Sequence, residues 1–174
     1  MNALDYFAYT VRLRRRLLEA LRDASLKPLL RDMGTNHHSI LQTLIHIMAV
    51  EESWVQEDLM GKPPATLNEF TAQYLKDVES LPAVIAAWRE ITAATIAYLH
   101  SHPDLGRRTE VGSGETKRAI TVEEVIYHLV GEELIHMGEV LAMTRQLGID
   151  LPSYFFLSVM EAEDRPWEDL QHIA

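Results

Sequence analysis

The stretch "TVEEVIYHLVGEELIHMGEVLAMTRQLG", residues 121–148, decides the fold because it contains one long helix together with both of its ends. Thr121 followed three residues later by Glu124 is a capping box, in which each side chain satisfies the backbone N–H of the other residue. Apolar residues then recur at intervals of three and four through the stretch. Gly148 is the kind of residue that commonly ends a helix. The pattern predicts a helix over residues 122–147.

Three further segments show the same helical periodicity. They lie at residues 4–21, at residues 36–59, and between Ser80 and the dipeptide His102-Pro103. Ser80 is a favourable N-cap, and the proline prevents the preceding residue from continuing the helix. Together with the stretch at residues 121–148, these segments predict four long helices.

Two smaller elements complete the expected architecture. The sequence "TLNEFTAQYLKDVESLP", residues 66–82, contains a short extra helix, and residues 105–120 resemble two extended arms around a turn at Gly112. The predicted fold class is therefore all-α, an antiparallel four-helix bundle with one short extra helix and a small hairpin before the last long helix. We expect one domain over residues 1–174, with a tail at residues 156–174 that packs across the bundle or against a second subunit.

Composition and charge limit the classes of function. The chain has 174 residues and a formal net charge of −10, which argues against nucleic-acid binding. It contains no cysteine, which excludes disulfides and thiolate metal sites. The one basic cluster, "RLRRR" at residues 12–16, is interpreted as the solvated face of a helix. No apolar run is long enough to span a membrane and no signal peptide is recognisable, so we expect no membrane partner and a cytoplasmic location.

A row of polar residues lies within the last predicted helix. His128, Glu132 and His136 follow one another at intervals of four, which turns each side chain by only about 40° around the axis. Such a row is either part of a metal site or a salt-bridged helix face. Glu133 lies about 100° from Glu132 around the axis and is expected to be solvated.

His46 is the second candidate position. It is flanked by Leu44, Ile45, Ile47 and Met48, and it is either a hydrogen-bonded core residue or a ligand facing the row across the bundle. Glu51 and Glu52 are weighed as outer carboxylates near the mouth of such a site. The remaining histidines receive surface or helix-end roles, and they are His37, His38, His100, His102 and His172.

Two segments carry a resemblance to a known family. "TLIHIMAVEESWV" at residues 43–55 and "EEVIYHLVGEELIHMGEVLAMTRQLGIDLPSYFF" at residues 123–156 resemble the DinB/YfiT-like superfamily of small bacterial four-helix-bundle proteins. The strongest piece is "HMGEVLAMTRQLGIDLP", which is similar to the ending "H-R-G-x" followed by "L-R-x-x-G" in that family. The resemblance reaches from the first helix to about Phe156.

The resemblance implies a divalent-metal site. Members commonly use three histidines, one from the second helix and two spaced four apart on the last, and these positions fall on His46, Glu132 and His136. Glu132 thus stands where the family usually has a histidine, and His128 is the second choice for the third ligand. The implied ion is zinc or nickel, with iron or manganese as alternatives.

The resemblance also implies a class of activity. Characterised members resemble metal-dependent transferases or isomerases that use a low-molecular-weight thiol such as bacillithiol or mycothiol, and hydrolysis is a related expectation. No catalytic residue beyond the metal ligands is identified. The alternative is a non-catalytic bundle, with or without metal, that acts as a homodimeric stress-response protein. DNA binding, which the family's damage-inducible members suggest, conflicts with the net charge of −10.

Overall fold

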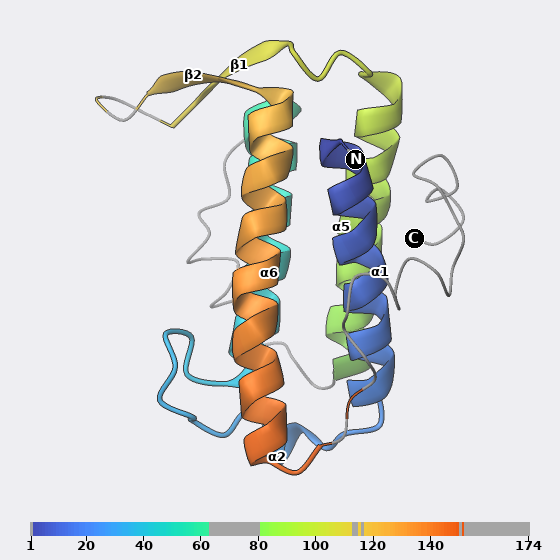
Figure 1. Cartoon of the computed structure of the whole chain (residues 1–174), viewed down its shortest axis with the longest axis vertical. Coiled ribbons are helices and arrows are strands. Elements are labelled where there is room, and N and C mark those ends of the chain that lie inside the picture. The colour runs from blue at the N-terminus through green and yellow to red at the C-terminus, as the bar shows by residue number, and fades with distance from the viewer. Residues whose placement is uncertain (1, 63–80, 113–114, 116, 150, 152–174) are drawn as a thin grey trace.

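A computed structural model of the chain describes residues 2–62, 81–112, 115, 117–149 and 151. This part of the chain is mostly helical, and its long helices run along the longest axis of the molecule (Figure 1). A two-stranded hairpin lies across one end. The all-helical expectation with a small hairpin is therefore confirmed. Among the described residues, no helix has the length and apolar character needed to cross a bilayer.

The first and last helices both begin at a capping box. Helix α1 spans Ala3–Leu21, and the side chain of Asn2 accepts the backbone N–H of Asp5. Helix α6 spans Val122–Gln146, and Thr121 with Glu124 forms the expected capping box. Gly148 follows α6 with a φ of +69°, a conformation that glycine adopts without the steric cost of a Cβ atom.

The second long helix begins later than the sequence predicts. Helix α3 spans Ile40–Glu52 instead of starting at residue 36, because Ser39 caps it by accepting the backbone N–H of Gln42. The preceding residue, His38, has a φ of +63°, which excludes it from a regular helix. The helix continues as a π-helix, η1, over Ser53–Leu59. A short helix that the sequence did not predict, α2, spans Leu26–Leu29 before α3.

The remaining elements match the expectations where the structure describes them. Helix α5 spans Leu81–Ser101. Strand β1, Arg108–Val111, pairs antiparallel with β2, Arg118–Thr121, so the predicted hairpin is confirmed. The short helix expected within residues 66–82 lies outside the described residues, apart from the two that open α5. The tail at residues 156–174 also lies outside them.

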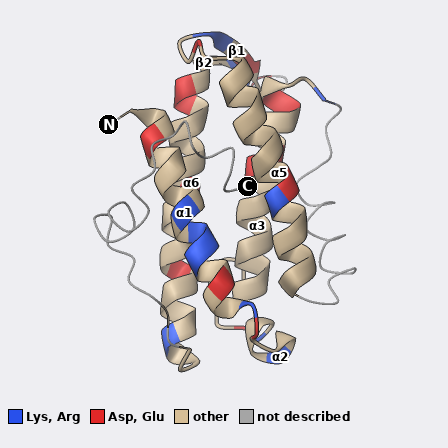
Figure 2. Cartoon of the chain, turned by 90° about the vertical axis from the view of Figure 1, so that its right-hand side faces the viewer, with Lys and Arg blue, Asp and Glu red and all other residues tan. Residues whose placement is uncertain are grey.

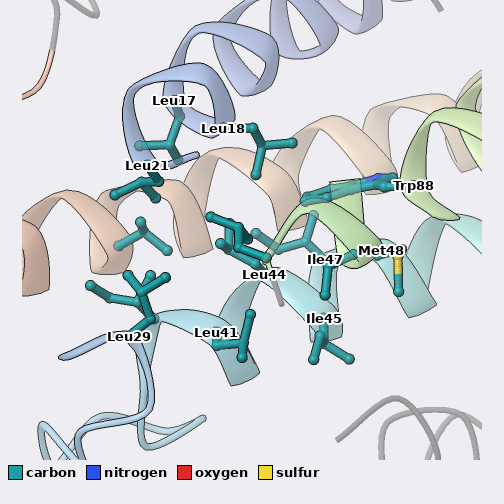
Figure 3. Packing of buried hydrophobic residues seen from close by; sticks show 14 of the residues in the cluster. Leu17, Leu18, Leu21, Leu29, Leu41, Leu44, Ile45, Ile47, Met48 and Trp88 are labelled. Atoms are coloured by element: carbon teal, nitrogen blue, oxygen red, sulfur yellow. The ribbon is translucent and has the colours of Figure 1, made fainter. Parts of the chain in front are cut away.

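The core forms where the long helices meet. Helix α6 packs against both α1 and α3, and α3 also packs against α5. Figure 3 shows Leu17, Leu21, Leu44 and Trp88 converging from α1, α3 and α5, and each of these side chains is at most 1% exposed. Burying one such leucine stabilises the fold by roughly 1.5–3 kcal/mol. Met137 of α6 belongs to the same buried cluster, so apolar contacts hold α3 and α6 side by side.

A buried ion cluster shows that one prediction about α1 was wrong. The basic residues form a band midway along this helix (Figure 2), yet Arg12 is 0% and Arg14 4% exposed. Arg14 donates from Nε and Nη2 to both carboxylate oxygens of Glu133, at 2.7 and 2.9 Å. Its Nη1 donates to Glu51 at 2.7 Å and to Thr92 at 2.7 Å. The guanidinium thus joins α1, α3, α5 and α6.

Glu133 was expected to be solvated, and it is only 3% exposed. Glu133 does point to a different side of the helix from Glu132, as predicted. That side faces the interior, where Arg14 balances the charge of Glu133. Burial alone would lower the pKa of Arg14, but the carboxylates of Glu133 and Glu51 raise it well above its usual value. Arg14 therefore remains a cation inside the protein.

Candidate metal centre

Three histidines from two elements and a loop converge on one point. They are His37, which precedes α3, His46 on α3, and His136 on α6, and one nitrogen from each lies within 4.8 Å of the others. The rings of His37 and His46 are stacked with centroids 3.9 Å apart. The ring of His136 meets both of them edge-on, at 4.9 and 4.8 Å. The arrangement gathers three imidazole donors in one partly buried cluster of His37, His46 and His136, named the histidine recess.

The position of His37 differs from the sequence expectation. His37 was expected to be exposed at the start of a helix, and on a continuous helix it would lie about 180° from His46. Because α3 begins only at Ile40, the preceding turn is free to fold back, and Met33 N–H donates to the carbonyl of His38 at 2.6 Å to close it. His37 therefore packs, half-buried, on the ring of His46. In the sequence, the helix-breaking residues before Ile40 and the possible cap at Ser39 were the signals that the helix begins late.

Glu132 lies beside two of these histidines. Its Oε2 is 3.4 Å from Nε2 of His136 and 3.8 Å from Nε2 of His46. Ligand atoms at about 2.0–2.2 Å around a tetrahedral ion are separated by roughly 3.3–3.6 Å, so the first of these spacings suits a shared ion and the second is slightly long. The structure thus brings together the three residues singled out in the sequence as ligands.

His128, the second choice, lies elsewhere. Its side chain is exposed, and its ring contacts Trp54 of η1 with centroids 4.5 Å apart. It is two helical turns from His136 and does not belong to the group of donors that the described residues form. His37 thus lies where a third nitrogen was expected from His128.

An outer carboxylate orients one of the donors. Glu139 Oε2 lies 2.9 Å from Nδ1 of His136, one turn along the same helix. A hydrogen bond from Nδ1–H to this carboxylate leaves Nε2 unprotonated and directed towards Glu132 and His46. Histidines that bind metals in proteins almost always have such a partner. Sequence reasoning missed Glu139, although its spacing of three residues from His136 was visible.

The electrostatics favour neutral imidazoles. The pKa of His46 is lowered to about 4, chiefly by burial and also by the neighbouring His37 and His136, while Glu132 acts in the opposite direction. Burial, with help from His136, also lowers the pKa of His37. A neutral imidazole has a free lone pair, which is the form that binds a metal ion. At neutral pH, His46 therefore needs to lose no proton before it coordinates.

Glu51 does not play the outer role considered for it. Its Oε2 accepts the indole N–H of Trp88 at 3.0 Å as well as the hydrogen bond from Arg14. The side chain is thus part of the buried ion cluster. Glu52 is half-buried, and burial raises its pKa. Among the described contacts, neither carboxylate is paired with a histidine of the recess.

A mostly helical fold with a histidine-rich recess between α3 and α6 defines a class of candidate metalloproteins. The chain belongs to the DinB family, whose model matches residues 1–169. A curated relative is an uncharacterized protein, YizA, of Bacillus subtilis (strain 168). It is 25% identical over 155 residues, which cover 88% of this chain and 93% of the relative. The resemblance noted in the sequence is therefore confirmed at the level of the family.

Proposed function

We propose that this protein binds one divalent metal ion through His37, His46 and His136, with Glu132 as a fourth ligand. The observation that carries the proposal is the convergence of three imidazole nitrogens within 4.8 Å. Three imidazoles and one carboxylate suit zinc or nickel, with iron or manganese as alternatives. In this assignment His37 supplies the nitrogen that Glu132 cannot provide. The site therefore still has three histidine ligands, although one of them comes from a different position in the chain.

The expected architecture supports this assignment. We propose that α1, α3 with η1, α5 and α6 form a single antiparallel four-helix bundle, because α6 packs on α1 and α3 while α3 packs on α5. In such bundles, metal sites are built from side chains on facing helices. Here α3 contributes His46, and α6 contributes Glu132 and His136.

The chemistry we propose is a thiol-dependent transfer, isomerisation or hydrolysis. A bound divalent ion lowers the pKa of a coordinated thiol or water and so supplies a nucleophile near neutral pH. The side chains of this chain would hold the ion and orient its ligands. Glu139 fixes the ring of His136, and Glu132 is exposed enough, at 30%, to be displaced by an incoming group. Displacement of Glu132 would open a fourth coordination position, which catalytic zinc sites keep for water or substrate.

Metal content tests the proposal directly. Protein prepared without an affinity tag should carry about one metal per chain by mass spectrometry of the elements, and His136→Ala should lose it. His128→Ala is the matched control, because it removes an exposed histidine of the same helix. Substoichiometric metal in the wild type after incubation with zinc, or equal loss in both variants, would contradict the proposal. Bound metal without thiol chemistry would favour a non-catalytic metal-binding protein.

A homodimer is the partner arrangement we propose alongside the metal site. Tyr127, Leu134 and Ile135 lie on one face of α6 and are 47%, 37% and 65% exposed. Large apolar residues grouped in this way are typical of surfaces that bind another protein. Ile135→Glu should shift the protein from dimer to monomer on a sizing column with light scattering. A monomeric wild type would rule out this arrangement.

A further inference from the structure

A groove, named the α1–α5 groove, lies between these two helices. Helix α6 packs closely on α1 and α3, and α3 on α5, but among the described residues α1 and α5 do not reach similarly close contact. The floor of the groove is apolar and consists of Val11, Leu18, Ile85 and Trp88. Its volume of about 90 Å³ leaves room for several waters or for one or two side chains, because a water needs roughly 10–15 Å³.

Exposed arginines surround this floor. Arg15, Arg22 and Arg89 line the α1–α5 groove together with one exposed carboxylate, Glu19, and the band of basic residues on α1 in Figure 2 borders it. Arg15 pairs with Glu19 at 3.4 Å, and Arg22 lies 3.5 Å from Asp23. Arg89 has no ion pair among the described residues. The rim therefore carries excess positive charge on a chain whose formal net charge is −10.

The buried ion cluster fixes the floor of the groove in advance. The guanidinium of Arg14 lies 4.3 Å from the centre of the Trp88 ring. The indole N–H of Trp88 donates to Glu51 at 3.0 Å, and Thr92, which also lines the groove, accepts a hydrogen bond from Arg14 at 2.7 Å. A segment that docks here does not have to order the residues beneath it, which lowers the entropic cost of binding.

The tail at residues 156–174 has a composition that complements the α1–α5 groove. Its one arginine is Arg165, and its carboxylates are those of Glu161, Glu163, Asp164, Glu168 and Asp169. The same stretch contains large apolar residues, which include Phe156, Met160, Trp167 and Leu170. An acidic segment with large apolar side chains matches an apolar floor that has a rim of arginines.

The chain that leads into the tail starts from the same part of the core. Leu151, the last described residue, packs against the buried cluster that also contains Leu18 and Trp88 of the groove floor. Helix α1 has 19 residues and is therefore about 28 Å long at a rise of 1.5 Å per residue. Ten residues of extended chain span up to about 33 Å. The chain after Leu151 is thus long enough to reach any point along the groove.

We propose that the α1–α5 groove binds the tail of the same chain. Large apolar side chains of the tail occupy the floor at Trp88, and its carboxylates pair with Arg22 and Arg89 at the rim. A tethered segment has an effective concentration on the order of millimolar, so contacts that are individually weak are sufficient. The proposal does not depend on the metal site.

A spin label on the tail tests this location. The chain has no cysteine, so Ala162→Cys in the full chain gives one attachment site between Glu161 and Glu163. The label broadens nearby amide signals in the nuclear magnetic resonance spectrum of isotope-enriched protein, and the same sample with the label reduced is the reference. We expect loss of the signals of three groove residues and retention of two on the exposed face of α6; the five are Leu18, Arg22 and Arg89, and Tyr127 and Ile135. Retention of the groove signals would overturn the proposal.

A mixed sample distinguishes the same chain from a second copy. Enriched chains without a label are mixed with labelled chains that are not enriched, so any broadening must come from the tail of another molecule. We expect the groove signals to be retained in this mixture. Their loss would assign the groove to the tail of a partner subunit and overturn docking within one chain.

Charge reversal identifies the groups responsible. Arg89→Glu should lower the ratio of docked to free tail, measured from the relaxation rates of the groove amides, by about two- to fivefold, because exposed ion pairs contribute modestly. Arg118→Glu is the matched control and should leave the ratio unchanged, since Arg118 is an exposed arginine of the hairpin that does not line the groove. Unchanged core amide signals show that each variant is folded. If Arg89→Glu has no effect, or the same effect as Arg118→Glu, the proposal is overturned.

Discussion

Two polar clusters lie in the same helical fold and differ in their exposure to solvent. The ion cluster of Arg14, Glu51 and Glu133 is closed, with side chains that are 4–5% exposed and mutually hydrogen-bonded. The histidine recess is more open, since the side chains of His46 and Glu132 are 17% and 30% exposed. Both clusters involve α3 and α6. In the ion cluster the guanidinium of Arg14 is hydrogen-bonded to both carboxylates, whereas in the histidine recess nitrogen lone pairs remain available to a ligand.

Adjacent residues on α6 take part in the two clusters. Glu133 points to Arg14 in the interior, and Glu132 points to His136 and His46 in the recess. A step of about 100° around the helix is enough to separate a structural carboxylate from a candidate ligand. The buried ion cluster ties α3 to α6, which are the helices that bear the histidines, so we expect it to fix their relative position.

The largest expected effect comes from breaking the closed cluster. Glu133→Ala leaves Arg14 as a buried cation without its bidentate partner, and we expect the free energy of unfolding to fall by about 3–5 kcal/mol. Urea unfolding measures this change. Glu132→Ala is the control, and it should change stability by less than about 1 kcal/mol because no buried partner loses its counter-charge. Equal losses in the two variants would show that the clusters do not differ in this respect.

The next effect concerns the open cluster. His46→Ala should weaken zinc binding by more than about 100-fold, a larger loss than outer partners of a metal usually cause. Competition with a chromophoric chelator measures the affinity. His37→Ala and Glu132→Ala should each weaken binding as well, and their order identifies the stronger third ligand. If His37→Ala has no effect while Glu132→Ala does, the ligand set reduces to the one expected from the sequence.

Much of the fold was predictable because its signals are local. The capping box at Thr121 and the glycine after α6 each act within a few residues, and periodicity located the long helices. The turn that returns His37 to His46 was not predictable in the same way, because it depends on where α3 begins and on how His38 is accommodated. A pattern that assumes one continuous helix places His37 on the opposite side.

The burial of Arg14 and Glu133 was missed for a related reason. Charged residues are almost never buried unless they are paired, and the partner of Arg14 lies 119 residues away on another helix. Nothing near residue 14 indicates that pairing. Glu132 and His136 could be singled out because they share one helix face, and His46 because it lies within an apolar segment of another predicted helix; the family resemblance then joined the three. The pairing of charged residues far apart in the chain is therefore the part of the structure that the sequence alone did not predict.

A smaller effect is expected from the carboxylate behind His136. Glu139→Ala removes the acceptor for Nδ1, and we expect zinc affinity to fall by about 10–100-fold with little change in unfolding free energy. The same competition assay and urea titration report both quantities. Lost stability without lost affinity would assign Glu139 to the fold instead of the metal site.

The smallest effect is expected one residue from Arg14. Arg15 pairs with Glu19 at 3.4 Å on the exposed side of α1, and the two side chains are 42% and 53% exposed. Glu19→Ala should change the free energy of unfolding by no more than about 0.5 kcal/mol, because exposed ion pairs contribute little. Thermal or urea unfolding at low and high salt would detect a larger contribution, which would weaken the contrast between buried and exposed arginines.

The most direct test of the central claim is an anomalous difference map from a zinc-soaked crystal of the full chain, measured on both sides of the zinc absorption edge. We predict one strong peak in the recess, coordinated by His37, His46 and His136, with Glu132 adjacent to it. An empty recess, or a zinc ion bound at His128 instead, would contradict the claim that the open cluster of this helical protein is a metal site.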